Sequence, residues 1–235
     1  MLRLRRGLDV LHLADMFGVS SSTVTRAFRT WLNLLYHELL FLIKWPTKEQ
    51  VLYKRPKCFK PFPRTRVIID CTEFFIQRPS IPSSQRKTWS SYKSHNTVKL
   101  LVAVTPRGSI CYLSRLWSGN VSDRQITKES GFMNFIERDD DVMADRGFLI
   151  RDLLANKSAT LNIPPFSLGK QLAPQATTKT RRIAKARIHV ERAIGRLKCF
   201  KILSGTMPLK MKPQMDEIVS VCACLSNLDT YLVKK

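Results

Sequence analysis

One apolar run of the sequence carries two acids, and this feature most constrains what the chain can fold into. Residues 66–76 read RVIIDCTEFFI, a strand-like segment of β-branched and aromatic side chains that contains Asp70 and Glu73. A carboxylate buried in a strand is costly or shifts its pKa, so Asp70 requires a reason beyond packing. Because strand side chains alternate between faces, Glu73 is expected to point away from the Asp70 side and is not counted as a metal ligand.

The segments that follow alternate between strand-like and helix-like patterns, which is typical of an α/β domain. Strands are predicted over 97–105, 109–117 and 141–145, and helices over 122–136, 181–200 and 215–231. The turn residues PRG at 106–108 join the second and third strands into a hairpin. Three antiparallel strands with the fourth lying parallel beside the first give an RNase H-like fold, a mixed five-stranded sheet flanked by helices.

The first 45 residues have the pattern of a small all-α helix-turn-helix. Residues 11–17 carry apolar side chains at helical spacing, and Gly18 can adopt the left-handed conformation of a tight turn. Ser20 is a good N-cap for a second helix over 21–31, with Val24, Phe28 and Trp31 on its inner face.

The outer face of this second helix is polar and basic. Short hydroxyl side chains and arginines at the start of such a helix suit contacts to the major groove and to phosphates. The predicted DNA-binding residues of this helix are Ser21, Ser22, Thr23, Thr25 and Arg26, with Arg29 on the same side. A plain helical hairpin that packs as a cap is the alternative interpretation.

Composition divides the chain and indicates its partner. Residues 46–66 hold four prolines and several basic residues, which is typical of a linker between a helix-turn-helix region at 1–45 and an α/β domain at 67–235. Lys and Arg number 40 against 18 Asp and Glu, a net charge of +22, which favours a nucleic-acid partner. A protein that binds RNA in bulk would fit the charge but not the helix-turn-helix or the placed acids.

Membranes, zinc and disulfides are not expected. The most apolar stretch, 31–45, is too short and too polar to span a bilayer, and residues 1–16 lack the apolar core of a secretory signal. The six cysteines are scattered without the paired spacing of a zinc site, so reduced thiols in an intracellular compartment are expected.

Two further acids join Asp70 as candidates for chemistry. Asp145 ends the predicted strand 141–145, and Glu191 is the only acid between Lys170 and Lys212, in a basic helix. Three converging carboxylates offer the hard oxygen ligands that Mg²⁺ (or Mn²⁺) prefers, and two such ions about 4 Å apart support in-line displacement at phosphorus. Two alternatives stay open: Glu191 as an ordinary salt-bridge partner, and Asp123 as the second acid in place of Asp145.

The chain resembles the DDE superfamily endonucleases of Harbinger/PIF-type DNA transposases. The strongest block, RIHVERAIGRLK at 187–198, has the spacing R-x3-E-x6-K of that family, although Ala184 stands where the related bacterial pattern has a tyrosine. Further blocks follow in the family's order, at 13–20, 22–26, 69–73, 92–99, 105–108, 119–124, 144–148 and 162–166. Their order over most of the chain makes the resemblance specific.

The resemblance implies roles for particular residues. Asp70, Asp145 and Glu191 correspond to the catalytic and metal-binding triad, and Asp123 to a supporting residue. Arg187 and Lys198 would flank Glu191 on one helix face and reach the DNA backbone. The expected cofactors are two Mg²⁺ or Mn²⁺ ions.

The resemblance also implies a function and a cellular setting. We expect a transposase-type endonuclease that cleaves and joins phosphodiester bonds of double-stranded DNA, at transposon ends and at a target. A homo-oligomer and a nuclear location are also expected, with residues 179–185 as a weak import signal. The alternative is a domesticated, catalytically inactive DNA-binding regulator that keeps the fold.

Overall fold

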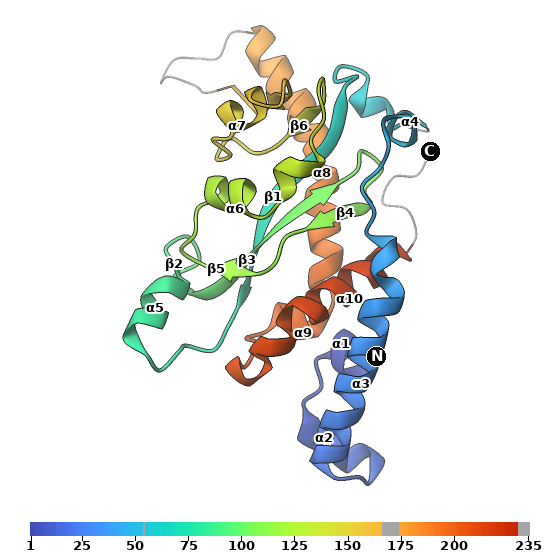
Figure 1. The fold of residues 1–235 in the computed structure, drawn as a ribbon, viewed down its shortest axis with the longest axis vertical. Coiled ribbons are helices and arrows are strands. Elements are labelled where there is room, and N and C mark those ends of the chain that lie inside the picture. The colour runs from blue at the N-terminus through green and yellow to red at the C-terminus, as the bar shows by residue number, and fades with distance from the viewer. Residues whose placement is uncertain (54, 166–173, 230–235) are drawn as a thin grey trace.

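The computed structural model of the chain describes residues 1–53, 55–165 and 174–229 (Figure 1). In this part of the chain seven strands form one sheet. The strands are β1 (Thr65–Phe75), β2 (Trp89–Ser90), β3 (His95–Val104), β4 (Ile110–Leu113), β5 (Trp117–Ser118), β6 (Asp141–Met143) and β7 (Thr160–Asn162).

The pairing of the strands confirms the RNase H-like, mixed sheet expected from the sequence, although the described residues form seven strands and not five. β3 pairs antiparallel with β1 and with β4, whereas β6 lies parallel beside β1 and β7 lies parallel beside β6. The predicted third strand is interrupted between β4 and β5, where the N–H of Leu116 donates to Asp216 (2.8 Å). β7 was not predicted as a strand, because three residues carry too little periodicity to be seen.

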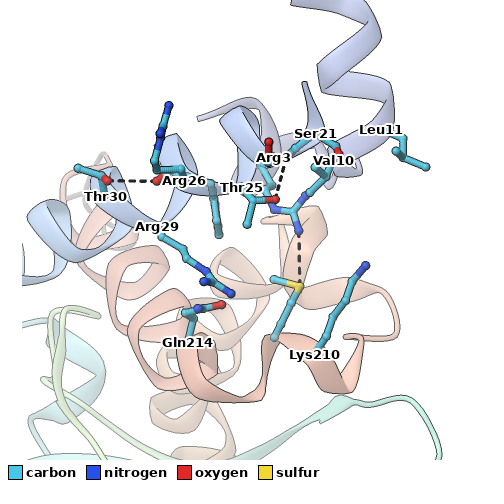
Figure 2. Close-up of a pocket in the computed structure, with 13 residues that line it drawn as sticks. Arg3, Val10, Leu11, Ser21, Thr25, Arg26, Arg29, Thr30, Lys210 and Gln214 are labelled. Carbon is cyan, nitrogen blue, oxygen red and sulfur yellow. Dashed lines mark hydrogen bonds between the residues drawn. The ribbon is translucent and has the colours of Figure 1, made fainter. Parts of the chain in front are cut away.

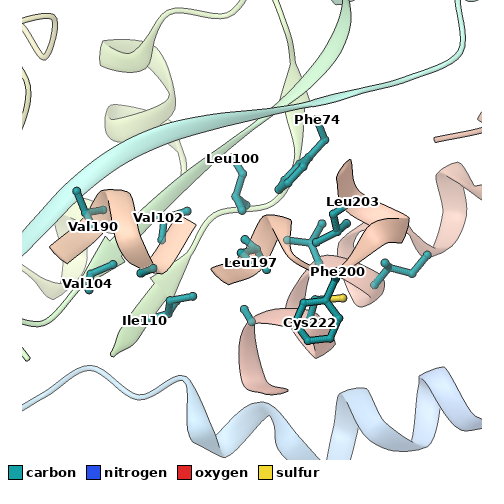
Figure 3. Packing of buried hydrophobic residues seen from close by; sticks show 14 of the residues in the cluster. Phe74, Leu100, Val102, Val104, Ile110, Val190, Leu197, Phe200, Leu203 and Cys222 are labelled. Carbon is teal, nitrogen blue, oxygen red and sulfur yellow. The ribbon is translucent and has the colours of Figure 1, made fainter. Parts of the chain in front are cut away.

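Each face of the sheet is covered by its own apolar core. Ile68 and Phe74 of β1 belong to one core with Val190 and Leu197 of α8 (Pro174–Lys198). Figure 3 shows Phe74 and the β3 residues Leu100, Val102 and Val104 facing the helices on this side. The alternate β1 residues Val67 and Ile69 belong to the second core, on the opposite face. Strict alternation along β1 therefore decides which side chains of this strand can meet α8.

The predicted helices are present, with shifted boundaries. Residues 122–136 form α6 (Asp123–Glu129) and the 3-10 turn η3 (Phe132–Phe135), because Gly131 breaks the helix with φ 85°. The long basic helix is α8, and the last described helix is α10 (Met215–Asn227). Residue 166 of the block at 162–166 and residues 230–231 of the predicted last helix lie outside the described residues. The other helical elements that follow β1 in the described residues are α5 (Pro82–Thr88), α7 (Arg151–Ala155), α9 (Lys201–Ser204) and η4 (Leu209–Gln214).

The helix-turn-helix forms as expected, with one wrong detail. α1 (Leu2–Arg6) precedes α2 (Val10–Phe17), Gly18 takes φ 62°, and the Ser20 side chain caps α3 (Ser21–Leu39) by accepting the N–H of Thr23. α3 continues eight residues past the predicted end at 31 and packs on α10 (Figure 1). Trp31 is 63% exposed and is not an inner-face residue, whereas Leu32 is buried.

The segment at 46–66, predicted as a linker, is packed against the rest of the molecule. The 3-10 turn η1 (Leu40–Leu42) precedes this segment. The segment contains α4 (Lys48–Leu52), which begins with a capping box at Thr47, and the 3-10 turn η2 (Lys57–Phe59). Phe59 and Phe62 are buried in the same core as α8. The division of the chain into domains stays a prediction. Among the described residues, no helix has the length and apolar character needed to cross a membrane.

Candidate active site

Asp70 lies in the middle of β1, on the side of the sheet that faces α8. Its register partner on β3 is Val102, and one carboxylate oxygen accepts the N–H of Cys71 (2.9 Å). Burial raises the pKa of Asp70 to about 6, and the charge of Arg187 opposes part of that rise. The carboxylate is therefore desolvated and positioned against α8, as a ligand of a buried cation would be.

Asp145 lies beside Asp70 because of the strand pairing. Ile68 of β1 and Met143 of β6 are parallel register partners. Asp70 lies two residues after Ile68, and Asp145 lies two residues after Met143. Asp145 is half exposed, and its Oδ1 accepts the N–H of Arg146 at 2.7 Å. Its negative charge contributes to the raised pKa of Asp70, ahead of the contribution from Asp123. The edge adjacency expected for the first two acids is therefore present.

Glu191 reaches this site from α8 through Arg187. The Nη1 of Arg187 donates to Asp145 Oδ1 at 3.0 Å, and its Nη2 lies 3.8 Å from Glu191 Oε1. The buried side of α8, with Ala186, Val190 and Ala193, holds the helix on the sheet. One guanidinium thus lies between an acid from the end of β6 and an acid one helical turn further along α8.

This arrangement bears on how metal ions would be held. In the described ranges no three side chains of His, Cys, Asp and Glu are grouped closely enough to bind a metal ion. The chemistry of the donors nevertheless suits a divalent cation, because Asp70 is largely desolvated and two half-exposed carboxylates, Asp145 and Glu191, lie at one guanidinium. The carboxylates of Asp145 and Glu191 repel each other, and in this structure the guanidinium of Arg187 supplies the positive charge that stabilises them.

Arg187 and Lys198 were predicted to reach DNA, and the structure places both against the sheet. The side chain of Arg187 is only 13% exposed, and its Nε is buried without a hydrogen-bond partner. Lys198 is partly buried, with its Nζ 5.8 Å from the centre of the Phe74 ring. Burial, and then the charge of Lys93, lower the pKa of Lys198. Contacts of these two residues with DNA stay a prediction.

Asp123, the alternative second acid, belongs to a polar network on the opposite face. Its carboxylate accepts from Lys99 (3.3 Å), which also lies 3.8 Å from Glu73. Glu73 in turn accepts the hydroxyl of Thr97 (2.7 Å). As expected from strand alternation, Glu73 is turned away from Asp70. The sequence interpretation missed Lys99; a lysine within an otherwise apolar strand was the available signal.

Gly119, which begins the block at 119–124, supports this network. A Cβ there would lie 2.2 Å from the Thr97 hydroxyl and 2.6 Å from the carbonyl oxygen of Thr88. No side chain fits that space without displacing its neighbours. The glycine therefore lets the segment that leads to Asp123 approach β3 closely.

The predicted DNA-binding residues of α3 lie at the exposed end of the helix-turn-helix. Thr23 and Ser22 share hydrogen bonds with the capping hydroxyl of Ser20 (2.8 and 2.9 Å). Thr25 donates to the backbone oxygen of Ser21. Ser21, Ser22, Thr25 and Arg26 line a cavity, whereas Thr23 does not belong to its lining. The structure thus brings four of these five residues to one surface.

Comparisons with known proteins identify the family of the chain. Residues 69–227 match the family described as DDE superfamily endonuclease, and residues 1–41 match the helix-turn-helix of DDE superfamily endonuclease. The chain is similar to "Protein ALP1-like" of Arabidopsis thaliana, at 22% identity over 96% of this chain and 58% of that protein. It is also similar to "Probable transposase for insertion sequence element IS702" of Microchaete diplosiphon, at 29% identity over 83% of this chain and 65% of that protein.

The matches cover most of this chain but only part of each relative. The chain spans less than two thirds of the length of either curated relative. No solved structure matches the chain significantly. The family match covers well over half of the residues and supports the resemblance to Harbinger-type transposases drawn from the sequence. The chain therefore belongs to the DDE superfamily endonucleases and carries the helix-turn-helix of that superfamily.

Proposed function

We propose that this chain is a transposase-type endonuclease that cleaves and joins DNA phosphodiester bonds, with Asp70, Asp145 and Glu191 as its catalytic and metal-binding residues. The observation that carries the proposal is the juxtaposition of Asp70 with Asp145 and, through Arg187, of Asp145 with Glu191. Strand pairing sets Asp70 and Asp145 side by side, and Arg187 links Asp145 to Glu191. The family generally uses divalent metal ions.

The chemistry proposed for the site is in-line displacement at phosphorus. Two Mg²⁺ or Mn²⁺ ions held there would activate a water or a 3′-hydroxyl and stabilise the leaving 3′-oxygen. The protein residues supply oxygen ligands and a desolvated setting. With a pKa of about 6, Asp70 is mostly ionised at neutral pH, and Arg187 must give up part of its contact with Asp145.

One observation favours a second candidate function, a DNA-binding regulator without nuclease activity. Arg187 already lies between Asp145 and Glu191 and offsets part of their charge, and in the described part of the chain no three metal-binding side chains are grouped. A site kept in this form would hold its acids in a structural ion pair. The helix-turn-helix would then carry the function alone.

Double-stranded DNA is the proposed partner in both cases. The net charge of +22 and the helix-turn-helix support it, and transposon ends and a target are the substrates proposed for the endonuclease. A homo-oligomer and a nuclear location belong to the same proposal.

The decisive experiment is nicking of supercoiled plasmid by the purified chain with Mg²⁺ or Mn²⁺. Asp145→Asn removes one proposed ligand, and Asp139→Asn, an exposed acid of the same type elsewhere, is the matched control. Metal-dependent nicking that is lost in Asp145→Asn and retained in Asp139→Asn supports the endonuclease. Absence of nicking together with intact DNA binding favours the regulator.

A further inference from the structure

A cavity separates the start of the helix-turn-helix from the endonuclease domain. It measures about 650 Å³ and lies between α3 and η4, with α1 at its side (Figure 2). We call it the α3–η4 cleft and define it by Arg3, Ser21, Thr25, Arg29, Lys210 and Gln214. Its walls come from the two parts of the chain that match separate families, at 1–41 and 69–227.

We propose that the α3–η4 cleft binds the phosphate backbone of duplex DNA, so that the helix-turn-helix and the endonuclease domain hold the same duplex. The proposal rests on the DNA partner proposed above and extends it to residues of η4. Neither the sequence motifs nor the family matches assign Arg3, Lys210 or Gln214 a role.

The charge of the cleft is entirely positive. Four cations line it, namely Arg3, Arg26, Arg29 and Lys210, and its lining residues include no acid. Hydroxyl side chains of α3 add neutral donors. Arginine, lysine, serine and threonine are the side chains that most often contact DNA phosphates. Such a lining is unfavourable in the free protein and is neutralised by a polyanion.

Arg3 gives the strongest indication of an anionic ligand. Its guanidinium lies 4.8 Å from the centre of the Phe28 ring, and its Nη2 has only the weak acceptor Sδ of Met211 at 3.8 Å. The Nε and Nη1 atoms are buried and have no hydrogen-bond partner. A guanidinium with unpaired, desolvated donors is costly, and the charge of an anion in the cleft would offset part of that cost.

The neighbouring acid does not fulfil that role. Asp9 acts on Arg3 through its charge, but its carboxylate caps α2 by accepting the N–H of His12 at 2.8 Å. Burial outweighs Asp9 and lowers the pKa of Arg3.

The placement of the cations favours an extended anion over a compact one. Figure 2 shows Arg29 extending from α3 towards Gln214. Arg3 contacts Met211, the residue after Lys210 on η4, through its Nη2. Positive charge therefore approaches the cleft from α1, α3 and η4. A strand of linked phosphates can contact all three elements, whereas one small anion would meet only part of them.

Lys210→Ala tests the proposal, because Lys210 is exposed and its loss leaves the packing of η4 intact. Lys212→Ala is the matched control, since Lys212 is an exposed lysine of the same 3-10 turn outside the cleft lining. Binding of the full chain to a fluorescent duplex of about 30 base pairs is followed by anisotropy over a series of salt concentrations.

We expect Lys210→Ala to weaken binding on the order of fivefold to tenfold near 0.1 M salt and to reduce the salt slope by about one. Arg29→Ala should act in the same direction, and Lys212→Ala should have a much smaller effect. Equal behaviour of Lys210→Ala and Lys212→Ala would overturn the proposal.

The outcome is separable from that of the proposed function. If plasmid nicking is observed while Lys210→Ala binds like Lys212→Ala, the cleft proposal fails and the endonuclease stands. If no nicking occurs but Lys210→Ala binds weakly, the cleft proposal stands and the endonuclease fails.

Discussion

The guanidinium of Arg187 donates to the carboxylate of Asp145 at 3.0 Å, although the two residues are 42 positions apart in the sequence. The same guanidinium faces Glu191, one turn further along α8. One arginine thus offsets part of the negative charge of the site's acids, and several measurable consequences follow from this and from the surrounding structure.

Removal of the guanidinium should strengthen binding of a divalent ion in the absence of DNA. Arg187→Gln relieves the repulsion between the guanidinium and the incoming cation, so the affinity for Mn²⁺ should rise roughly tenfold. Isothermal titration calorimetry measures this, and Arg192→Gln, an exposed arginine of the same helix, is the control. Unchanged or weaker Mn²⁺ binding in Arg187→Gln would contradict competition between the arginine and the metal.

The two candidate second acids should separate by their effects. Asp123→Asn leaves Lys99, whose side chain is 14% exposed, with a weakened partner and should reduce the free energy of unfolding by about 1 to 3 kcal/mol. Plasmid nicking should largely persist in that variant. Asp145→Asn should abolish nicking with little loss of stability, because Asp145 is half exposed. Urea unfolding and nicking, measured on both variants, would refute this assignment if the effects were reversed.

Asp70 should make the metal-free protein less stable as the pH rises. Its pKa is raised by burial from 3.8 to about 6 in the folded chain, so the folded state holds the proton more tightly. The destabilisation is absent below pH 3.8, grows as the pH rises to about 6, and is complete above that value. In buffer with EDTA, Asp70→Asn should therefore be more stable than the wild type by on the order of 2 to 3 kcal/mol at neutral pH. Thermal unfolding should show this gain shrinking towards pH 4, and a constant gain would contradict the shift.

Gly119→Ala should be strongly destabilising. The added Cβ would lie 2.2 Å from the Thr97 hydroxyl and 2.6 Å from a backbone oxygen that cannot move freely. A loss of about 3 kcal/mol is expected from overpacking. Gly195→Ala on α8, where a Cβ meets nothing within 4 Å, should be neutral or slightly stabilising. Chemical unfolding of both variants tests the contrast.

The buried side of α3 should be defined by Leu32 and not by Trp31. Leu32 is 2% exposed and belongs to the same apolar core as the buried residues of α10. Leu32→Ala should therefore lower the free energy of unfolding by about 3 kcal/mol. Trp31 is 63% exposed, so Trp31→Ala should change stability by no more than about 0.5 kcal/mol. Guanidinium unfolding measured on the two variants would refute the observed orientation of α3 if Trp31→Ala were the costlier change.

Much of the local structure could be predicted because it depends on neighbours in the chain. Alternation along β1 placed Asp70 and Glu73 on opposite faces, and the turn at Gly18 with its Ser20 cap is encoded within four residues. The strand order agrees with the RNase H-like arrangement that the sequence suggested, in which Asp70 and Asp145 belong to neighbouring strands.

Other features could not be predicted, because they depend on which surfaces meet after folding. The apolar periodicity predicted Trp31 on the inner face of α3, but in the folded chain Leu32 is buried and Trp31 is exposed, and α3 packs on α10. The proline-rich stretch at 46–66 looked like a linker, yet Phe59 is fully buried. Local propensity does not report the apolar surface that another element offers to these side chains.

The sequence by itself was therefore enough to predict the turn of the helix-turn-helix and the RNase H-like order of the strands. The contact of Arg187 with Asp145, and the cleft that brings Arg3 within 3.8 Å of Met211, arise from segments 42 and 208 residues apart. Their physical basis is the packing of α8 on the sheet and of α3 on α10, since burial of these helices fixes where their charged side chains come to lie.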